Sequence, residues 1–193
     1  MATITRDTLL TLEAYAKQRK DFRARVLVHK RDRTIHLGEH VTLLFEDELT
    51  VRYQIQEMLR IEKTFEEAGI QDELDVYNPL VPDGGNLKAT MLVEYEDVDE
   101  RRVALARLRG IEDAVWVRVA EFPAVRAIAD EDLDRSNEQK TSSVHFLRFE
   151  LDAPMIAAWK AGQSVVVGVD HPAYRAEVAL AEPVRDALKA DFA

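Results

Sequence analysis

Glu62 is a carboxylate at a position where the sequence pattern predicts a buried apolar side chain. It lies on a predicted helix over residues 48–68, where an advance of about 100° per residue gives one apolar stripe. The stripe consists of Val51, Ile55, Met58, Leu59 and Phe65. A buried carboxylate must gain a partner or a proton, because unpaired burial of the charge is costly. Glu62 is therefore either half of a structural ion pair with Arg148 or Arg52, or a metal ligand or general base.

Two histidines are placed where their rings could do chemistry. Strand alternation over residues 143–151 groups His145 with Leu147, Phe149 and Leu151 on the apolar side. His145 is then either a core histidine with both ring nitrogens hydrogen-bonded or a neutral imidazole bound to a metal. His171 stands at the end of a valine-rich strand, where functional side chains often gather and where turn chemistry is the alternative explanation.

Two histidines and a carboxylate suffice for an iron or zinc site. We expect Glu62, His145 and His171 to converge on one such ion, with Glu57 from the neighbouring helix flank as a further carboxylate. This predicts a metal-binding, redox-accessory protein, since an open coordination position would permit oxygen or peroxide chemistry. The sequence shows no substrate pocket and leaves open whether the protein is an enzyme.

Two other classes of function remain open. One is a non-catalytic adaptor that binds a partner protein or a small anion, since arginine and tyrosine tend to anchor interfaces. Its surface would consist of Arg52, Arg60, Tyr77, Asn78, Asp83, Asn86 and Lys140, and Gln54 and Arg148 are further candidate ligand-binding residues. The other is a metal-free enzyme with Glu62 as the base and Arg148 orienting an anionic substrate. Metal content separates the first hypothesis from these two.

Composition narrows the classes of partner and chemistry. The 193 residues contain 36 acidic and 26 basic side chains, for a net charge of −10, which disfavours nucleic acid and anionic membranes. The absence of cysteine excludes disulfides, thiolate metal sites and cysteine nucleophiles. The N-terminus lacks the pattern of a secretion signal and no apolar stretch could span a bilayer, so we expect a cytoplasmic protein with no membrane partner. The recognised hydrolase, zincin, dinucleotide and calcium-loop patterns are absent.

The first half of the chain is predicted to contain helices and a hairpin. A helix over residues 6–22 precedes two strands, 25–30 and 34–37, whose outer face would hold His29 and His36. A third strand begins at Val41 and leads to the long helix 48–68, which ends at Gly69. Prolines, paired glycines and asparagines in residues 71–86 indicate an ordered loop closed by a tight turn.

The second half is predicted to be richer in strands. Strands are expected at 87–95, 114–119, around 125–128, 143–151, 164–170 and 174–180. Helices are expected at 98–109, between the N-cap Asp152 and Gly162, and from Pro183 onward, with an acidic surface connector over residues 130–140. We therefore predict one α+β domain over residues 1–193, with one long and several shorter helices packed on a largely antiparallel sheet.

Several blocks spread along nearly the whole chain resemble an uncharacterised bacterial family, catalogued as domain of unknown function 3501. The blocks are Leu12-Glu-Ala-Tyr, Tyr53-Gln-Ile-Gln-Glu-Met-Leu-Arg-Ile-Glu, Glu73-Leu-Asp-Val-Tyr-Asn-Pro-Leu-Val-Pro-Asp-Gly, Leu87-Lys-Ala-Thr-Met, Lys140-Thr-Ser-Ser-Val-His-Phe-Leu-Arg-Phe-Glu and Gly168-Val-Asp-His-Pro. The family has no established activity. The resemblance implies redox or rubrerythrin-like partners, and hence iron or peroxide chemistry, because such proteins are associated with the family.

Overall fold

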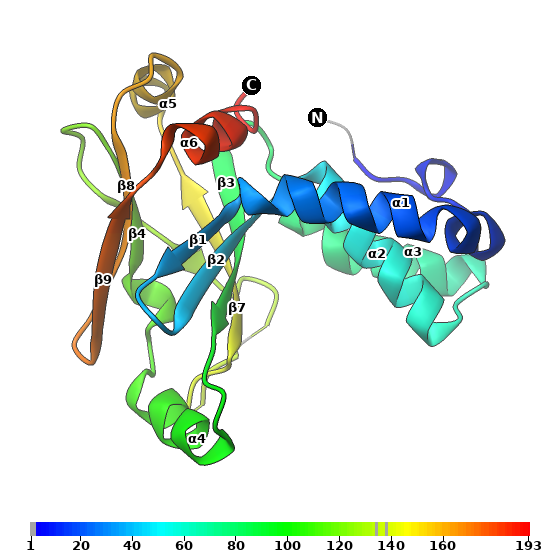
Figure 1. Ribbon diagram of the computed structural model, residues 1–193, viewed down its shortest axis with the longest axis horizontal. Coiled ribbons are helices and arrows are strands. Elements are labelled where there is room, and N and C mark those ends of the chain that lie inside the picture. The colour runs from blue at the N-terminus through cyan, green and yellow to red at the C-terminus, as the bar shows by residue number, and fades with distance from the viewer. Residues whose placement is uncertain (1–2, 134, 138) are drawn as a thin grey trace.

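The computed structural model describes residues 3–133, 135–137 and 139–193. Two antiparallel sheets pack face to face, and helices α1 to α3 form a further layer against the outer face of one sheet (Figure 1). The helices are α1 (Leu12–Arg31), α2 (Glu48–Glu62), α3 (Glu67–Tyr77), α4 (Val98–Arg107), α5 (Ala153–Lys160) and α6 (Glu182–Lys189), with 3-10 turns η1 (Arg6–Thr8), η2 (Asn78–Leu80) and η3 (Glu112–Ala114). The predicted α+β class is confirmed.

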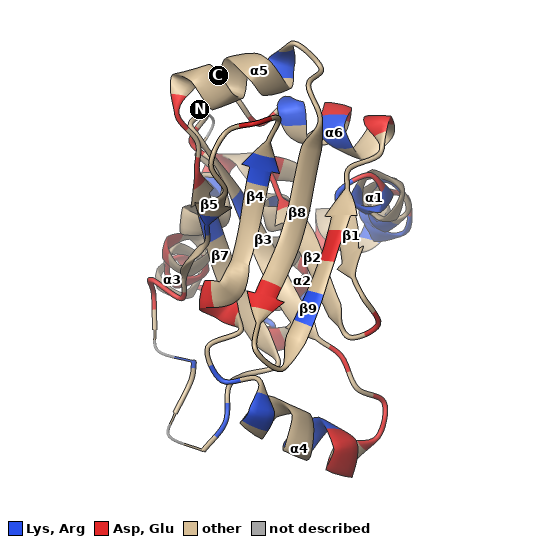
Figure 2. Ribbon diagram, turned by 90° about the vertical axis from the view of Figure 1, so that its left-hand side faces the viewer, with Lys and Arg blue, Asp and Glu red and all other residues tan. Residues whose placement is uncertain are grey.

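The first sheet, sheet A, has the strand order β1-β2-β3-β7-β6, and the second, sheet B, has the order β5-β4-β8-β9. The strands are β1 (Thr34–Leu37), β2 (Val41–Glu46), β3 (Asn86–Val93), β4 (Val115–Val119), β5 (Val125–Arg126), β6 (Ile128–Ala129), β7 (Val144–Glu150), β8 (Val165–His171) and β9 (Tyr174–Ala179). Every pairing is antiparallel. Figure 2 shows sheet B in front, with α5 and α6 at one end of the sandwich and α4 at the other.

The main core lies between the sheets because the strands alternate in burial. In β3, Leu87, Ala89 and Met91 are buried in this core, while Lys88 and Thr90 point to the helical side and are half-buried. The same alternation in β7 places His145 inside the sandwich and Phe146 outside it. A smaller apolar cluster fills the helical layer, formed by Ile4, Leu9, Val51, Ile55, Leu59, Ile70 and Leu74.

The first strand of the predicted N-terminal hairpin is wrong. Residues 25–30 belong to α1 and not to a strand, and the helix begins after Thr11, whose side chain accepts a hydrogen bond from the Ala14 amide at 3.2 Å. A short apolar run does not distinguish a strand from a helix. Here Val26 lies eleven residues, three helical turns, after Tyr15, and both are buried on one face of α1. His29 is therefore a helical residue, and its Nε2 lies 2.5 Å from Asp47 Oδ2.

The predicted long helix 48–68 is two helices. α2 ends at Glu62 because Lys63 adopts a left-handed conformation with φ 55°, and α3 occupies most of the segment predicted as a loop. The apolar stripe therefore stops at Leu59. Glu62 is exposed and Phe65 is 67% exposed, so their predicted burial was wrong. The reversal at Lys63 lets Ile70 of α3 pack in the same cluster as the α2 stripe.

The other elements agree with the predicted ones to within a few residues. Helix α5 begins after the N-cap Asp152, which accepts a hydrogen bond from the Met155 amide at 2.8 Å, and is followed by Gly162 at φ 82°. The sheet prediction was correct in its antiparallel pairing, and the structure divides the strands between two sheets. No helix in the described part of the chain is both long and apolar enough to cross a membrane.

Arg33 joins the helical layer, sheet A and the C-terminal helix. It is only 1% exposed and lies between α1 and β1. Its guanidinium donates hydrogen bonds to the carbonyls of Phe45 at 3.0 Å, Glu46 at 3.1 Å and Ala187 at 3.2 Å. It also pairs with the carboxylate of Asp191. Several backbone segments therefore depend on one side chain.

The carboxyl group of Asp191 predicts a pH effect on stability. Burial raises its pKa from 3.8 to about 6 despite the attraction of Arg33. The stability that this group contributes is therefore fully present below pH 3.8 and is lost as the pH rises through about 6. In Asp191→Asn this contribution is absent, so the slope of unfolding free energy against pH between 4 and 6 becomes more positive. Urea unfolding across this range measures it, and an unchanged slope, as expected for the exposed Asp72→Asn control, would contradict the assignment.

Candidate metal-binding cluster

Glu112, Asp130 and His145 form a compact group at one end of the sandwich. Each offers one ligand atom within 4.8 Å of the others, and the described residues contain no other such group of three or more. Glu112 comes from η3, just before β4 of sheet B, whereas Asp130 follows β6 and His145 lies on β7 of sheet A. The cluster therefore bridges the two sheets. His145 is 0% exposed and Glu112 is 6% exposed.

Asp130 fixes the orientation of the His145 ring. Its Oδ2 lies 2.5 Å from His145 Nδ1, which must donate its hydrogen because a carboxylate only accepts. Its Oδ1 accepts from the Phe146 amide at 2.9 Å, and the Asp130 backbone is left-handed with φ 50°. Arg135 lies 3.4 Å from the same carboxylate. The 2.5 Å separation is a hydrogen bond and is too short to admit an ion between the two atoms.

The other ring nitrogen faces a group of oxygen atoms. His145 Nε2 lies 2.9 Å from Thr141 Oγ1, 3.1 Å from the Ser142 carbonyl and 3.8 Å from Glu112 Oε2. Thr141 Oγ1 lies 3.0 Å from Glu112 Oε2, and the Ser136 hydroxyl donates to the other oxygen of Glu112. Thr141, only 1% exposed, closes the group on this side.

Thr141 has one hydroxyl hydrogen, and Glu112 Oε2, His145 Nε2 and the Ser136 hydroxyl oxygen all lie within hydrogen-bond distance of it. If it is donated to Glu112, the neutral ring of His145 presents its Nε2 lone pair without a donor, and if it is donated to Nε2, Glu112 Oε2 loses that bond. Both carboxylates also need compensation for their burial. Arg135 provides this for Asp130, whereas Glu112 has only hydroxyl donors and the His145 ring beside it within the described residues, so a metal ion next to Glu112 would supply positive charge there. The cluster can therefore act as a structural network or as a cation site.

The structure does not bring the four sequence-predicted metal ligands together. His145 is in the cluster and Glu62 is exposed on α2. His171 Nε2–H donates to the Arg109 carbonyl at 3.0 Å, and its Nδ1 accepts from the Ala173 amide at 3.1 Å, which explains this buried ring by turn chemistry.

Glu57 is a structural carboxylate between α1 and α2. It accepts from Tyr15 Oη at 2.6 Å, from Arg19 at 2.7 and 2.8 Å, and from Arg60 at 3.1 Å. The hydrogen bonds from Arg19 lower the pKa of Glu57 from 4.5 to about 2. Burial acts in the opposite direction, and the hydrogen bonds from Tyr15 and Arg60 add to the lowering. The predicted ligand-binding residue Arg60 is thus engaged in an ion pair.

Of the other predicted ligand-binding residues, one makes a structural contact and three line cavities. Asn78 holds the N-terminal segment, accepting from the Ile4 amide at 3.1 Å and donating to the Ile4 carbonyl at 2.9 Å. Gln54, Tyr77 and Arg148 line cavities between the helical layer and sheet A. Arg148 pairs with Glu131 and Glu150 and not with Glu62.

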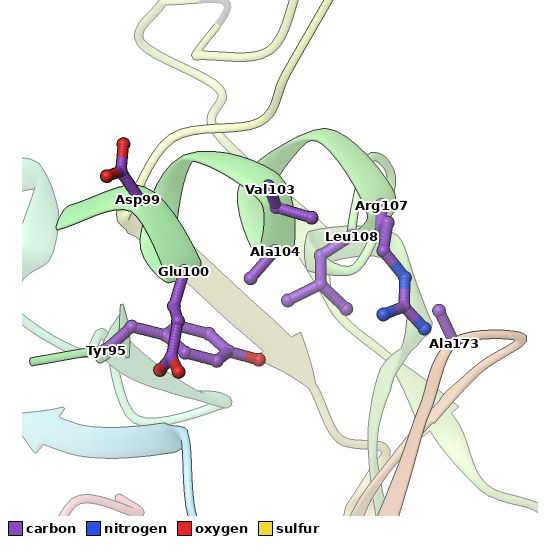
Figure 3. A pocket seen from close by; sticks show the side chains of 8 residues that line it. All are labelled: Tyr95, Asp99, Glu100, Val103, Ala104, Arg107, Leu108 and Ala173. Carbon is purple, nitrogen blue, oxygen red and sulfur yellow. The ribbon is translucent and has the colours of Figure 1, made fainter. Parts of the chain in front are cut away.

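A further cavity of about 470 Å³ lies beneath α4, away from the cluster. Figure 3 shows Glu100 and Tyr95 at one end of it, Arg107 at the other and Leu108 between them. The ring of Tyr95 stacks on His40 at 3.9 Å between centroids. No member of the metal-binding cluster lines this cavity.

Glu112, Asp130 and Thr141 were missed by sequence reasoning. Asp130 is the first residue of the segment predicted as an acidic surface connector, Thr141 directly follows that segment, and Glu112 lies in a turn after Gly110. None has a periodic or spaced partner. The one available signal was the inward position of His145, because a buried imidazole requires polar neighbours.

These features define an α+β protein with a β-sandwich, a helical layer and a buried His/carboxylate cluster. The chain belongs to the family described as protein of unknown function (DUF3501), whose family model matches residues 3–192. It is similar over its whole length to a solved structure from Burkholderia pseudomallei K96243, described as a novel protein of unknown function. The two share 56% identity and a TM-score of 0.95, with 100% of each chain covered. No curated protein sequence matches the chain significantly.

Proposed function

We propose that the protein binds one divalent metal ion between His145 Nε2 and Glu112 Oε2. The observation behind this proposal is the spacing of the oxygens of Thr141, Ser142 and Glu112 around Nε2, with separations of 2.9, 3.1 and 3.8 Å. Two ligands at about 2.0–2.2 Å from a tetrahedral ion lie about 3.3–3.6 Å apart. Shifts of a few tenths of an ångström would turn these atoms into a coordination sphere.

Asp130 is placed where its carboxylate can orient the ring of His145 for metal binding. Metal-bound histidines almost always donate their second ring hydrogen to a carboxylate or carbonyl, and this contact fixes the tautomer that leaves the other nitrogen free. His145 Nδ1 makes this bond to Asp130. An imidazole with carboxylate and neutral oxygen ligands, and no thiolate, suits zinc or ferrous iron and also admits manganese.

The burial of the site favours a structural ion. The ring of His145 and the hydroxyl-bearing Thr141 are closed from solvent, so the described residues show no open route for a substrate. An ion here would tie η3, the turn before β4 of sheet B, to β7 of sheet A. The redox-accessory role remains a prediction from the sequence, and its rubrerythrin-like partners remain a prediction from the resemblance; iron bound in this cluster would support both.

Metal loading of Glu112→Gln tests the proposal. Chelator-treated protein is incubated with zinc, manganese or, without oxygen, ferrous ions and then desalted. Elemental analysis should give about one ion per chain for the wild type. Glu112→Gln should bind the ion at least tenfold more weakly, because the amide removes a charged ligand. Glu46→Gln is the matched control, since Glu46 is also a buried carboxylate that accepts from two hydroxyl groups, those of Thr50 and Thr90.

Two results would overturn the proposal. One is a wild-type protein that retains none of the three ions. The other is Glu112→Gln retaining the ion as tightly as the wild type and Glu46→Gln. Either result would identify the cluster as a hydrogen-bonded network that holds no ion.

A further inference from the structure

A groove runs between the outer face of sheet A and the helical layer. It consists of two adjoining cavities of about 640 and 220 Å³, which share Tyr77, Leu80 and Phe146 as lining residues. Ligand pockets of proteins commonly have volumes of about 300–1,000 Å³ and mostly apolar walls. The larger cavity has this size and reaches Lys88 on β3 and Leu133 in the connector between β6 and β7.

Lys88 lies in a charged row across three strands. It is the register partner of Glu46 on β2 and of Arg148 on β7, and all three point to the groove side. Arg148 already pairs with Glu131 and Glu150, and Glu46 accepts from two hydroxyl groups. Within the described residues, the side-chain amine of Lys88 makes no hydrogen bond or ion pair, although the residue is half-buried.

The surroundings of Lys88 disfavour its charge. Burial, and then the positive charge of Arg148, lower the pKa of its amine, while Glu131, Asp83 and Glu150 act in the opposite direction. Asp75 of α3 also lines the cavity. A half-buried ammonium without a partner is stabilised by a bound anion, because the ion pair replaces the part of its hydration that burial removes.

We propose that this groove binds a small monocarboxylate with an apolar body. The carboxylate pairs with Lys88, and the body packs against Tyr77, Leu80 and Phe146. The other cations that line the larger cavity are neutralised, Arg148 by Glu131 and Arg135 by Asp132. Among the described residues that line the larger cavity, Lys88 is the one cation without an ion pair, which matches a ligand with one negative charge. The carboxylates around it repel a more highly charged phosphate.

Binding of phenylacetate, compared with its neutral analogue phenylacetamide, tests this proposal. Saturation-transfer NMR and calorimetry on the full chain give both affinities. We expect phenylacetate to bind at least tenfold more tightly than phenylacetamide, and Lys88→Met to lose at least tenfold in phenylacetate affinity. Lys88→Arg should bind within a few-fold of the wild type, because it keeps the charge. Lys17→Met, at an exposed position on α1, should match the wild type.

The proposal is overturned if phenylacetate does not bind, if the amide binds as tightly, or if a folded Lys88→Met retains the wild-type affinity. Circular dichroism and the urea midpoint establish folding of each variant. The groove has no residue in common with the cluster of Glu112, Asp130 and His145. Loss of metal binding and loss of phenylacetate binding are therefore separable results.

Discussion

Replacing Arg33 with methionine is expected to lower the free energy of unfolding by about 3–5 kcal/mol, because it removes one partner of a buried ion pair. Methionine fills much of the same volume but donates no hydrogen bond. The substitution leaves the buried carboxylate of Asp191 without its Arg33 partner and removes one hydrogen bond from each of three carbonyl oxygens. Urea unfolding followed by circular dichroism measures the loss.

Arg31→Met provides the matched control for this prediction. Arg31 is the last residue of α1 and is exposed, so its replacement should change stability by no more than about 0.5 kcal/mol. Arg33→Lys should fall between the two, since an ammonium keeps the charge but not the planar fork that reaches several acceptors at once. Equal stability of the Arg33→Met and Arg31→Met variants would contradict the joining role of Arg33.

Replacing His145 with alanine is expected to destabilise the fold by about 3–5 kcal/mol as well. Without the imidazole, the carboxylates of Glu112 and Asp130 remain buried near each other and lose the group between them. A cavity is also left inside the sandwich, since His145 is fully buried. The loss is measured on metal-free protein, so that it reports the side chains alone.

His171→Ala is the matched control for His145→Ala. His171 is also a buried histidine, at 8% exposure, but it contacts backbone groups and no carboxylate. Its removal should cost about 1–3 kcal/mol, typical of an unsatisfied buried hydrogen-bonding group. Added metal should raise the thermal midpoint of the His171→Ala variant and leave that of His145→Ala unchanged. Equal losses in the two metal-free variants would argue against the electrostatic role of His145.

The sequence by itself determined the elements whose signals are local. Strand alternation of period two placed His145 on the inner face of β7, and the Asp152 cap and Gly162 bounded α5. These signals hold because side-chain direction in a strand and capping at a helix end depend on neighbouring residues in the chain. The antiparallel α+β class followed from the same local patterns.

Predictions from local sequence patterns were wrong where a segment can adopt more than one conformation and packing against distant residues determines which one forms. The run at residues 25–30 has strand-forming residues, yet it belongs to α1, in which Tyr15 and Val26 are both fully buried on one face. Lys63 adopts a left-handed conformation although it is not a glycine, so no residue type in the sequence signals the end of α2 there. Because α2 ends at this point, Glu62 does not continue the predicted apolar stripe. The candidate site built on Glu62 therefore could not be placed from periodicity.

Only the tertiary structure decided the partners of His145 and Lys88. Glu112 and Asp130 belong to segments of different sheets, and they meet His145 because the sheets pack face to face. Lys88 faces a groove because the helical layer covers only part of sheet A, and its neighbours Glu46 and Arg148 are set by strand register. Strand register and sheet packing are long-range properties, so a single sequence shows which residues are polar and inward but not which of them meet.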